Sequence, residues 1–302
     1  MARFKLYISL IFLLLFTLSV KEDEPENVLA TATDSTGNMV PDSSFVVFDG
    51  TGYREKPDLT QYGLKPIHII YPTRLWKKTT QELKGTTSLP FDSLLEKQAE
   101  KARQENDIAV IDIEHWPIKG NAQTVEQSVD RYIEVLESFR KLTPDMQYGF
   151  YSLPPVHDYW NAIQDTSSSR YREWEEKNRH LEELASKVDV FFPSLYTYYQ
   201  DRQRWVRYAI ANIKQARKYN EDKPVYVFLW PQYHGYNKKL KGEFLDPDFW
   251  KIQLKTARKY ADGIVIWTPS RLEWDSNADW WKVTKDFLQK LDNKNTDAGI
   301  TQ

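Results

Sequence analysis

The sequence predicts an α/β protein whose fold is a TIM-like (β/α) barrel of seven or eight strands, within residues 43–292. Seven short apolar segments, rich in β-branched and aromatic residues, have the composition of buried parallel strands. Longer segments with apolar residues at helical spacing lie between them. Because no second composition zone interrupts this alternation, a closed barrel is favoured over an open, doubly wound sheet.

The two kinds of segment follow one another along the chain. The predicted strands are residues 45–48, 67–71, 108–113, 147–151, 188–196, 225–230 and 263–267. The predicted helices are residues 91–104, 125–142, 171–186, 205–219, 249–260 and 280–291. In (β/α) barrels the active site lies at the carboxyl ends of the strands, so we look for functional side chains there.

Charge and aromatic content narrow the class of partner. The chain has 41 Lys and Arg against 43 Asp and Glu, whereas nucleic-acid-binding proteins usually carry a basic excess, so we expect no nucleic-acid partner. Residues 49–52, Asp-Gly-Thr-Gly, lack the third glycine of a dinucleotide-binding turn. Aromatic residues make up 14% of the chain, with 11 Trp and 18 Tyr, which fits either a sugar-binding groove or an aromatic core.

The N-terminus indicates export. Arg3 and Lys5 precede an apolar run over residues 6–20, which polar residues follow abruptly. This pattern predicts a signal peptide over residues 1–20, either cleaved or retained as an N-terminal anchor, and only such an anchor would contact a membrane. The protein is then secreted, periplasmic or on the cell surface. Residues 21–42 are expected to form a flexible polar leader and residues 293–302 a flexible tail.

The chain has no cysteine and therefore no disulfide. An exported protein of this kind must rely on its core for stability, which suggests bacterial rather than animal secretion.

A pair of carboxylates lies at the end of the third predicted strand. In residues 108–116, Ile-Ala-Val-Ile-Asp-Ile-Glu-His-Trp, strand alternation places Asp112 and Glu114 on one face and the isoleucines on the other. The isoleucine face suits packing under the helices, which leaves both carboxylates facing the barrel lumen. Such neighbours would have pKa values that are pushed apart, giving one protonated acid and one charged partner.

A purely structural role for the pair is the alternative. An uncompensated buried carboxylate costs several kcal/mol, on the order of the penalty for a buried ion, so a structural pair would need basic partners. Few basic residues lie near the predicted strand ends, and Arg74 and Arg271 are the candidates. We therefore favour a catalytic role for Asp112 and Glu114.

Residues 110–117, Val-Ile-Asp-Ile-Glu-His-Trp-Pro, resemble the catalytic strand of the hyaluronidases of the bee-venom and sperm type, in which an Asp-x-Glu pair is followed by Trp. Further segments are similar to that family in order and spacing, over about residues 43–290: residues 69–71, 148–154 (Tyr-Gly-Phe-Tyr-Ser-Leu-Pro), 192–196 (Phe-Pro-Ser-Leu-Tyr), 224–233 and 263–267. The family's barrel is a distorted one with seven strands, so the resemblance implies a distorted barrel of seven strands here, in agreement with the seven apolar segments.

The resemblance implies an endo-acting glycoside hydrolase that cleaves a hyaluronan- or chondroitin-like polysaccharide containing N-acetylhexosamine, without a cofactor or metal. The substrate's acetamido oxygen attacks the anomeric carbon, with retention of configuration. Glu114 would act as general acid and then as base. Asp112 would hold the acetamide N–H, Tyr196 would donate to the same acetamide, and Trp267 would wall the subsite.

The other site residues that the resemblance assigns to this chain are substrate contacts. Tyr71 and Tyr233 are expected as groove hydroxyls, and Trp116 and Tyr151 as aromatic substrate-binding residues.

The chain departs from the family at three places. Trp116 is followed by Pro117, where the family has Arg. The family's disulfides cannot form, and residues 48–53, Phe-Asp-Gly-Thr-Gly-Tyr, replace a Trp-Asn-x-Pro segment. The sequence is thus similar to a divergent, cysteine-free, bacterial-looking member, and the polymer it would cleave stays open.

Two other functional classes are compatible with a barrel. A chitinase-like enzyme would show a longer Asp-x-x-Asp-x-Asp-x-Glu pattern, but Ala109 and Val110 precede Ile111 here. A non-catalytic carbohydrate-binding barrel is the other alternative, against which the intact carboxylate pair argues.

Histidine and serine motifs point to no other chemistry. The five histidines fall in separate segments without metal-ligand spacing. His115 is expected to face away from Glu114 in a packing role, whereas His157 and His234 follow strand ends and are candidates for lining the groove. No Gly-x-Ser-x-Gly segment is present, so ester hydrolysis is not expected.

Overall fold

In a computed structural model of the protein, residues 45–269 and 272–299 are described, with side chains as far as residue 292. The chain divides into Met1–Val40 and Pro41–Gln302, and every described residue belongs to the second unit. The expected signal segment, the leader over residues 21–42 and Arg271 lie outside the described residues.

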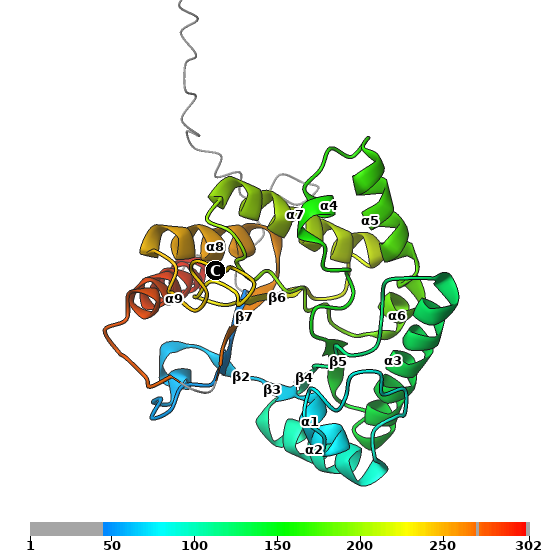
Figure 1. The fold of residues 1–302 in the computed structure, drawn as a ribbon. Coiled ribbons are helices and arrows are strands. Elements are labelled where there is room, and N and C mark those ends of the chain that lie inside the picture. The colour runs from blue at the N-terminus through cyan, green and yellow to red at the C-terminus, as the bar shows by residue number, and fades with distance from the viewer. Residues whose placement is uncertain (1–44, 270–271, 300–302) are drawn as a thin grey trace, which may run out of the picture. The chain divides into compact units, whose positions relative to one another are not determined.

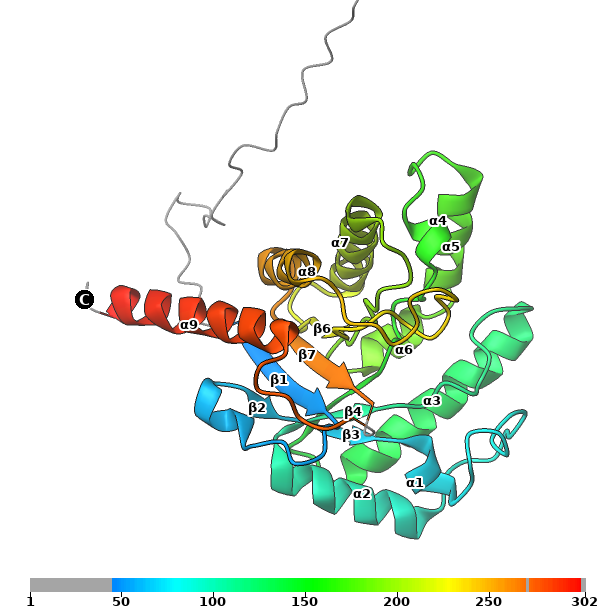
Figure 2. The same ribbon diagram turned by 60° about the vertical axis from the view of Figure 1, so that its left-hand side comes forward.

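All strand pairs within the two sheets are parallel, and the helices flank them on the outside (Figures 1 and 2). One sheet has the order β2-β1-β7-β6 and the other β3-β4-β5. The strands are β1 (Val46–Thr51), β2 (Lys65–Pro66), β3 (His68–Ile70), β4 (Ile108–Ile111), β5 (Gln147–Phe150), β6 (Tyr226–Leu229) and β7 (Gly263–Thr268).

The two sheets follow one another around a ring. β2 and β3 belong to one extended stretch, in which β2 pairs with β1 and β3 pairs with β4. On the other side, residues 191–194 bridge both sheets, with Phe192 paired to Tyr151 and Ser194 to Phe228. This arrangement confirms the predicted (β/α) barrel, in a distorted form that is not one continuous closed sheet.

The predicted strand at residues 188–196 is wrong as a regular strand, because this segment forms only isolated bridges. Pro193 lies in its middle and has no N–H to donate, although its carbonyl accepts from Phe228 N at 2.9 Å. At its start, the Asp189 side chain accepts from Tyr148 N at 3.0 Å, in place of a backbone carbonyl. The segment therefore bridges β5 and β6 without forming a continuous ladder of backbone hydrogen bonds with either strand.

Four of the longer helices begin at a side-chain cap. Asn121, Ser168, Asp201 and Asp246 each accept a hydrogen bond from the backbone N–H three residues later. The helical elements are η1 (Leu59–Tyr62), α1 (Pro72–Trp76), α2 (Asp92–Glu105), α3 (Ala122–Leu142), α4 (Tyr159–Ala162), α5 (Ser169–Arg179), α6 (Glu182–Lys187), α7 (Arg202–Tyr219), α8 (Pro247–Tyr260) and α9 (Asp279–Gly299).

Most predicted helices are confirmed to within a few residues, with two differences. The single helix predicted at residues 171–186 is divided into α5 and α6. The tail expected from residue 293 is helical as far as Gly299, as the end of α9. None of the described helices is long and apolar enough to cross a membrane.

The buried residues form two layers separated by the strands. The inner layer fills the ring and includes Phe48, Val110 and Phe228, whereas the outer layer packs between strands and helices and includes Ile111 and Ile113. The alternation predicted for β4 is confirmed, because Val110 faces inward and its neighbour Ile111 faces outward. The ring interior is therefore a packed core below the strand ends.

Gly149 in β5 lies where the backbone of residues 190–192 crosses closely. A Cβ at this position would collide with the Val190 carbonyl oxygen and approach the Phe192 ring to 2.9 Å. We expect Gly149→Ala to lower the free energy of unfolding by about 2 kcal/mol, because the backbone must shift. Urea denaturation measures this loss. Gly235→Ala, where an added Cβ meets nothing within 4 Å, is the control, and an equal effect of both changes would contradict the explanation.

Candidate active site

Asp112 and Glu114 directly follow β4. The pairing of the chain continues past the end of the strand, because Asp112 N donates to Ile70 O and Tyr151 N donates to Ile111 O, both at 3.0 Å. Strand geometry therefore still holds at Asp112, whose side chain lies on the same face as the inward Val110. The expected placement of both carboxylates is confirmed, since both line a cleft at the carboxyl ends of the strands.

The cleft has a volume of about 1110 Å³ and opens between the ends of β1, β3, β4 and β7. Its lining residues include Tyr71, Asp112, Glu114 and Trp267. Other segments contribute charged residues to its lining: Asp49, Arg74 and Lys84. A cleft of this size, with aromatic walls and a few convergent polar groups, has the properties of a small-molecule or oligomer site.

Burial shifts both carboxyl groups toward their protonated forms. It raises the pKa of Asp112 from 3.8 to about 8, with the charge of Glu114 as the second cause. The pKa of Glu114 is also raised by burial, although its side chain keeps contact with solvent through the cleft. Perturbed carboxyl groups in a cleft are typical of catalytic sites.

The purely structural explanation of the pair needs counter-ions. Within residues 45–269 and 272–292, the structure has no ion pair or side-chain hydrogen bond at either Asp112 or Glu114. Arg74 lines the same cleft without forming an ion pair to them. The nearby cation Lys56 is paired with Asp49 at 2.6 Å. The described part of the chain thus leaves the two carboxyl groups uncompensated.

An aromatic wall faces the carboxylates. The Tyr196 ring stacks on Trp267, with centroids 5.6 Å apart and planes at 27°. Trp267 Nε1 donates to the Tyr71 hydroxyl at 2.9 Å. The Tyr151 hydroxyl shares a hydrogen bond of 3.0 Å with Ser194 Oγ, and its ring lies 5.9 Å from that of Tyr196. The structure therefore brings four of the expected aromatic residues, Tyr71, Tyr151, Tyr196 and Trp267, into one cluster, of which Tyr71 and Trp267 line the cleft.

Trp116 does not lie in this cleft. Its indole is only 2% exposed and belongs to the outer layer, where Nε1 donates to Thr86 O at 2.9 Å and the ring packs against Trp76 and Tyr132. β4 ends at Ile111, five residues before Trp116. Strand alternation therefore no longer sets the direction of the Trp116 side chain. We do not retain Trp116 as a substrate contact of the main cleft.

Tyr233 also points elsewhere. It is 6% exposed and packs in the outer layer. The next residue, His234, faces the aromatic wall instead, with its ring 6.1 Å from Tyr196 and 5.8 Å from Trp230. The groove position expected for Tyr233 is thus taken by the next residue, His234. Tyr233 forms an isolated bridge with Thr197, and neighbouring residues of such an extended segment point to opposite faces.

Two members of the wall were not named as site residues from the sequence, although strand alternation predicts that Tyr198 shares a face with Tyr196. Trp230 lies 5.2 Å from Trp267 and 5.5 Å from Tyr196, between ring centroids. Tyr198 lies 4.7 Å from His234. The signal for Trp230 was present, because it directly follows β6 as the carboxylates follow β4.

The two other histidines considered above have different surroundings. His115 packs edge-on against Trp76 at 4.9 Å, in agreement with a packing role, and it also borders the main cleft. His157 lines a smaller pocket beside Glu114. Among the described residues, no group of three or more His, Asp or Glu side chains could hold a metal ion.

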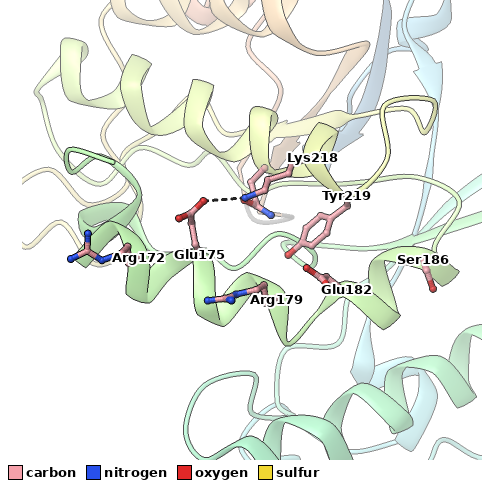
Figure 3. Close-up of a pocket in the computed structure, with 8 residues that line it drawn as sticks. Arg172, Glu175, Arg179, Glu182, Ser186, Lys218 and Tyr219 are labelled. Carbon is pink, nitrogen blue, oxygen red and sulfur yellow. Dashed lines mark hydrogen bonds and ion pairs between the residues drawn. The ribbon is translucent and has the colours of Figure 1, made fainter. Parts of the chain in front are cut away.

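A further pocket lies on the outside of the barrel, between α5, α6 and α7 (Figure 3). Its volume is about 550 Å³, and its lining is dominated by charges of both signs, such as the ion pair of Glu175 and Lys218 at 3.0 Å. It has no aromatic wall and no uncompensated carboxylate pair. The cleft at the strand ends is therefore the better candidate site.

The fold and the site together define a (β/α) barrel with a carboxylate-bearing cleft at its strand ends. No protein-family model matches the sequence, and no curated protein matches it. Among solved structures, the chain is similar to bee venom hyaluronidase, with a TM-score of 0.54 and 16% identity over 82% of this chain and 97% of that one.

The same bee venom enzyme in complex with a hyaluronic acid tetramer gives a TM-score of 0.54 and 16% identity, over 82% of this chain and 96% of that one. A chitinase from Pseudoalteromonas aurantia gives a TM-score of 0.43 and 13% identity, over 78% of this chain and 77% of that one. The likeness to the bee venom enzyme shows a shared barrel fold.

The raised pKa of Asp112 predicts how stability depends on pH. Between the pKa of an unfolded Asp and about 8, the folded protein binds the extra proton, so this contribution to stability is present at low pH and is lost as the pH rises through 8. We expect Asp112→Asn to raise Tm by about 5 °C or more at pH 9, because an amide has no charge to desolvate. The gain should vanish near pH 4. Calorimetric scans from pH 4 to 9 measure it, and a gain that is independent of pH would refute the explanation.

Proposed function

We propose that the protein is an endo-acting glycoside hydrolase that cleaves a polysaccharide containing N-acetylhexosamine. One observation carries the proposal: two carboxyl groups with raised pKa values share one face at a strand end, with no counter-ion among the described residues, beside an aromatic wall. The bee venom enzyme, whose name states its substrate, supports this assignment through its shared barrel fold. Export of the chain, as expected from residues 1–20, would bring it to an extracellular polymer.

Glu114 is the proposed general acid and base. Its carboxyl group reaches the solvent of the cleft, so a glycosidic oxygen can approach it. Its raised pKa keeps a proton available closer to neutral pH than an ordinary glutamate would. After the leaving sugar departs with that proton, the Glu114 carboxylate accepts a proton from the attacking water, which restores the starting state.

Asp112 is the proposed partner of the substrate's acetamido group. In the empty cleft, deeper burial and the charge of Glu114 favour the proton on Asp112. An acetamide N–H that donates to Asp112 favours its ionised form, and the shared proton then resides on Glu114, where it is needed. The acetamido oxygen attacks the anomeric carbon to form a cyclic intermediate, and the protein supplies no nucleophile. Water then opens this intermediate, so that two inversions give net retention of configuration.

The aromatic residues form the proposed sugar subsite. Trp267 offers a flat face stacked on Tyr196, and the hydrogen bond from its indole to Tyr71 fixes its orientation. The buried Tyr196 hydroxyl is the proposed donor to the acetamido oxygen. The Tyr151 hydroxyl is hydrogen-bonded to Ser194, and Tyr151 would hold the Tyr196 hydroxyl in place.

We expect Glu114→Gln to lower the turnover number at least 1000-fold on the polymer that the wild type cleaves, because the amide cannot transfer a proton. The full chain is assayed on hyaluronan, chondroitin, heparosan and chitin oligomers, and saturated reducing-end products are measured. Tm should stay within a few degrees of the wild type or rise, because the amide removes repulsion with Asp112.

Glu126→Gln is the matched control, since Glu126 is exposed on α3, away from the cleft. Full activity of Glu114→Gln would overturn the assignment of the acid. Cleavage of chitin oligomers alone would favour a chitinase-like enzyme. Binding to a polymer without cleavage would favour a carbohydrate-binding barrel.

A further inference from the structure

A loop over residues 231–245 lies between β6 and α8 and folds back on itself. Its two arms meet in an antiparallel bridge between Gln232 and Phe244. The loop carries His234, which faces the aromatic wall, and Tyr236, which lines the main cleft. The base of this loop therefore lies beside the wall, close to the end of β6.

Gln232 is a buried polar residue in the base of this loop, with only 4% of its surface exposed. Its Oε1 accepts a hydrogen bond from Trp230 Nε1 at 2.9 Å, and its Nε2 donates to Gly242 O at 2.5 Å. Burying an amide costs free energy unless its polar atoms are paired, and here both ends of the amide are paired. One side chain thus joins the wall residue Trp230 to the opposite arm of the loop.

The two partners fix the orientation of the Gln232 amide. The indole N–H of a tryptophan can only donate a hydrogen bond, and a backbone carbonyl can only accept one. Turning the amide over would place its NH₂ group against the Trp230 N–H and its oxygen against the Gly242 oxygen. The partners therefore permit one orientation, in which Gln232 holds the Trp230 indole by its N–H.

Trp230 in turn stands edge-on to the stacked rings of Trp267 and Tyr196. Its plane lies at 88° to that of Trp267, with centroids 5.2 Å apart, and at 70° to that of Tyr196, with centroids 5.5 Å apart. Because the three rings interlock, a rotation of Trp230 would remove the contact that supports Trp267 from the side. The position of Trp267, which lines the cleft, thus depends on Trp230 as well as on its hydrogen bond to Tyr71.

We propose that Gln232 is a positioning residue of the site. It holds Trp230 by the indole N–H, and Trp230 holds Trp267 against the cleft. Gln232 itself lines neither the main cleft nor the smaller pocket beside Glu114, so its effect on the reaction passes through Trp230. The inference rests on the proposed function, in which Trp267 forms part of the sugar subsite.

The first test is Gln232→Met, which keeps the length of the side chain and removes both of its hydrogen bonds. We expect kcat/KM on the polymer that the wild type cleaves to fall about tenfold to 100-fold, because a small displacement of a substrate-orienting group can cost that much. Full chains are compared by the release of saturated reducing-end products. An unchanged kcat/KM would overturn the proposal.

A double-mutant cycle with Trp230→Phe tests whether Gln232 acts through Trp230. Phenylalanine has no indole N–H for Gln232 to hold. In the Trp230→Phe background, Gln232→Met should therefore change kcat/KM less than about twofold. A fall of about tenfold that persists in this background would overturn the proposal, because Gln232 would then act by another route.

Gln98→Met is the matched control, because Gln98 is also 4% exposed and its Oε1 lies 3.4 Å from a ring nitrogen, His68 Nε2. This pair joins α2 to the first residue of β3, at the end of the strand away from the cleft. The control should lower Tm and leave kcat/KM within about twofold of the wild type. If Gln98→Met lowered kcat/KM as much as Gln232→Met, the effect would be one of general destabilisation and the proposal would fail.

A measurement without substrate separates this proposal from the proposed hydrolase. The indole N–H signals of the tryptophans are observed by NMR in the protein labelled with ¹⁵N at the indole nitrogens, and Trp230→Phe and Trp267→Phe identify the two signals of interest. Gln232→Met should shift both signals and raise the hydrogen-exchange rate of the Trp230 indole N–H about tenfold or more, because its acceptor is lost.

Gln98→Met should leave the signals of Trp230 and Trp267 unchanged. If the wild type cleaves no polymer, the proposed hydrolase fails, and the indole signals alone then decide whether Gln232 holds Trp230. Signals of both tryptophans that stay unchanged in Gln232→Met would overturn the positioning role whatever the activity.

Discussion

The pleat of β4 is the constraint on which the rest of the site depends. Ile111 and Ile113 are buried under the helices, so Asp112 and Glu114 have to face the ring. A slip of one residue would place both isoleucines in the lumen and both carboxyl groups in the apolar outer layer. The hydrogen bond from Asp112 N to Ile70 O holds the register up to the first carboxylate. The apolar face of one strand thereby fixes where the charged groups lie.

This placement is unfavourable for the empty protein. Asp112 is surrounded by the packed interior of the ring and by a second carboxyl group, and these raise its pKa to about 8. The described residues offer no cation in return. Stability is given up locally to hold a proton that the proposed reaction uses, a compromise that is common at functional sites. The aromatic wall of Trp267, Tyr196 and Tyr71 packs beside the same two carboxyl groups.

The two pockets give the site a direction. The main cleft lies toward β1 and β7. The smaller pocket, which His157 lines, lies toward β5, and Glu114 lines both. Aromatic faces and carboxyl groups characterise the first, whereas the cation Lys119 and the imidazole of His157 characterise the second. The external pocket between α5, α6 and α7 is lined mainly by charges of both signs and has no aromatic wall (Figure 3).

The sequence by itself determined the barrel class, most strand and helix positions, and the shared face of Asp112 and Glu114, because periods of 2 and 3.6 residues are local properties of the chain. Only the tertiary structure decided the surroundings of side chains beyond the strand ends. Trp116 turned into the outer layer once the chain left β4, and His234 rather than Tyr233 reached the wall. Lys119 donates to His157 O at 2.9 Å, a contact between residues that lie 38 positions apart in the sequence. Loop directions depend on such long-range contacts, which no local pattern encodes.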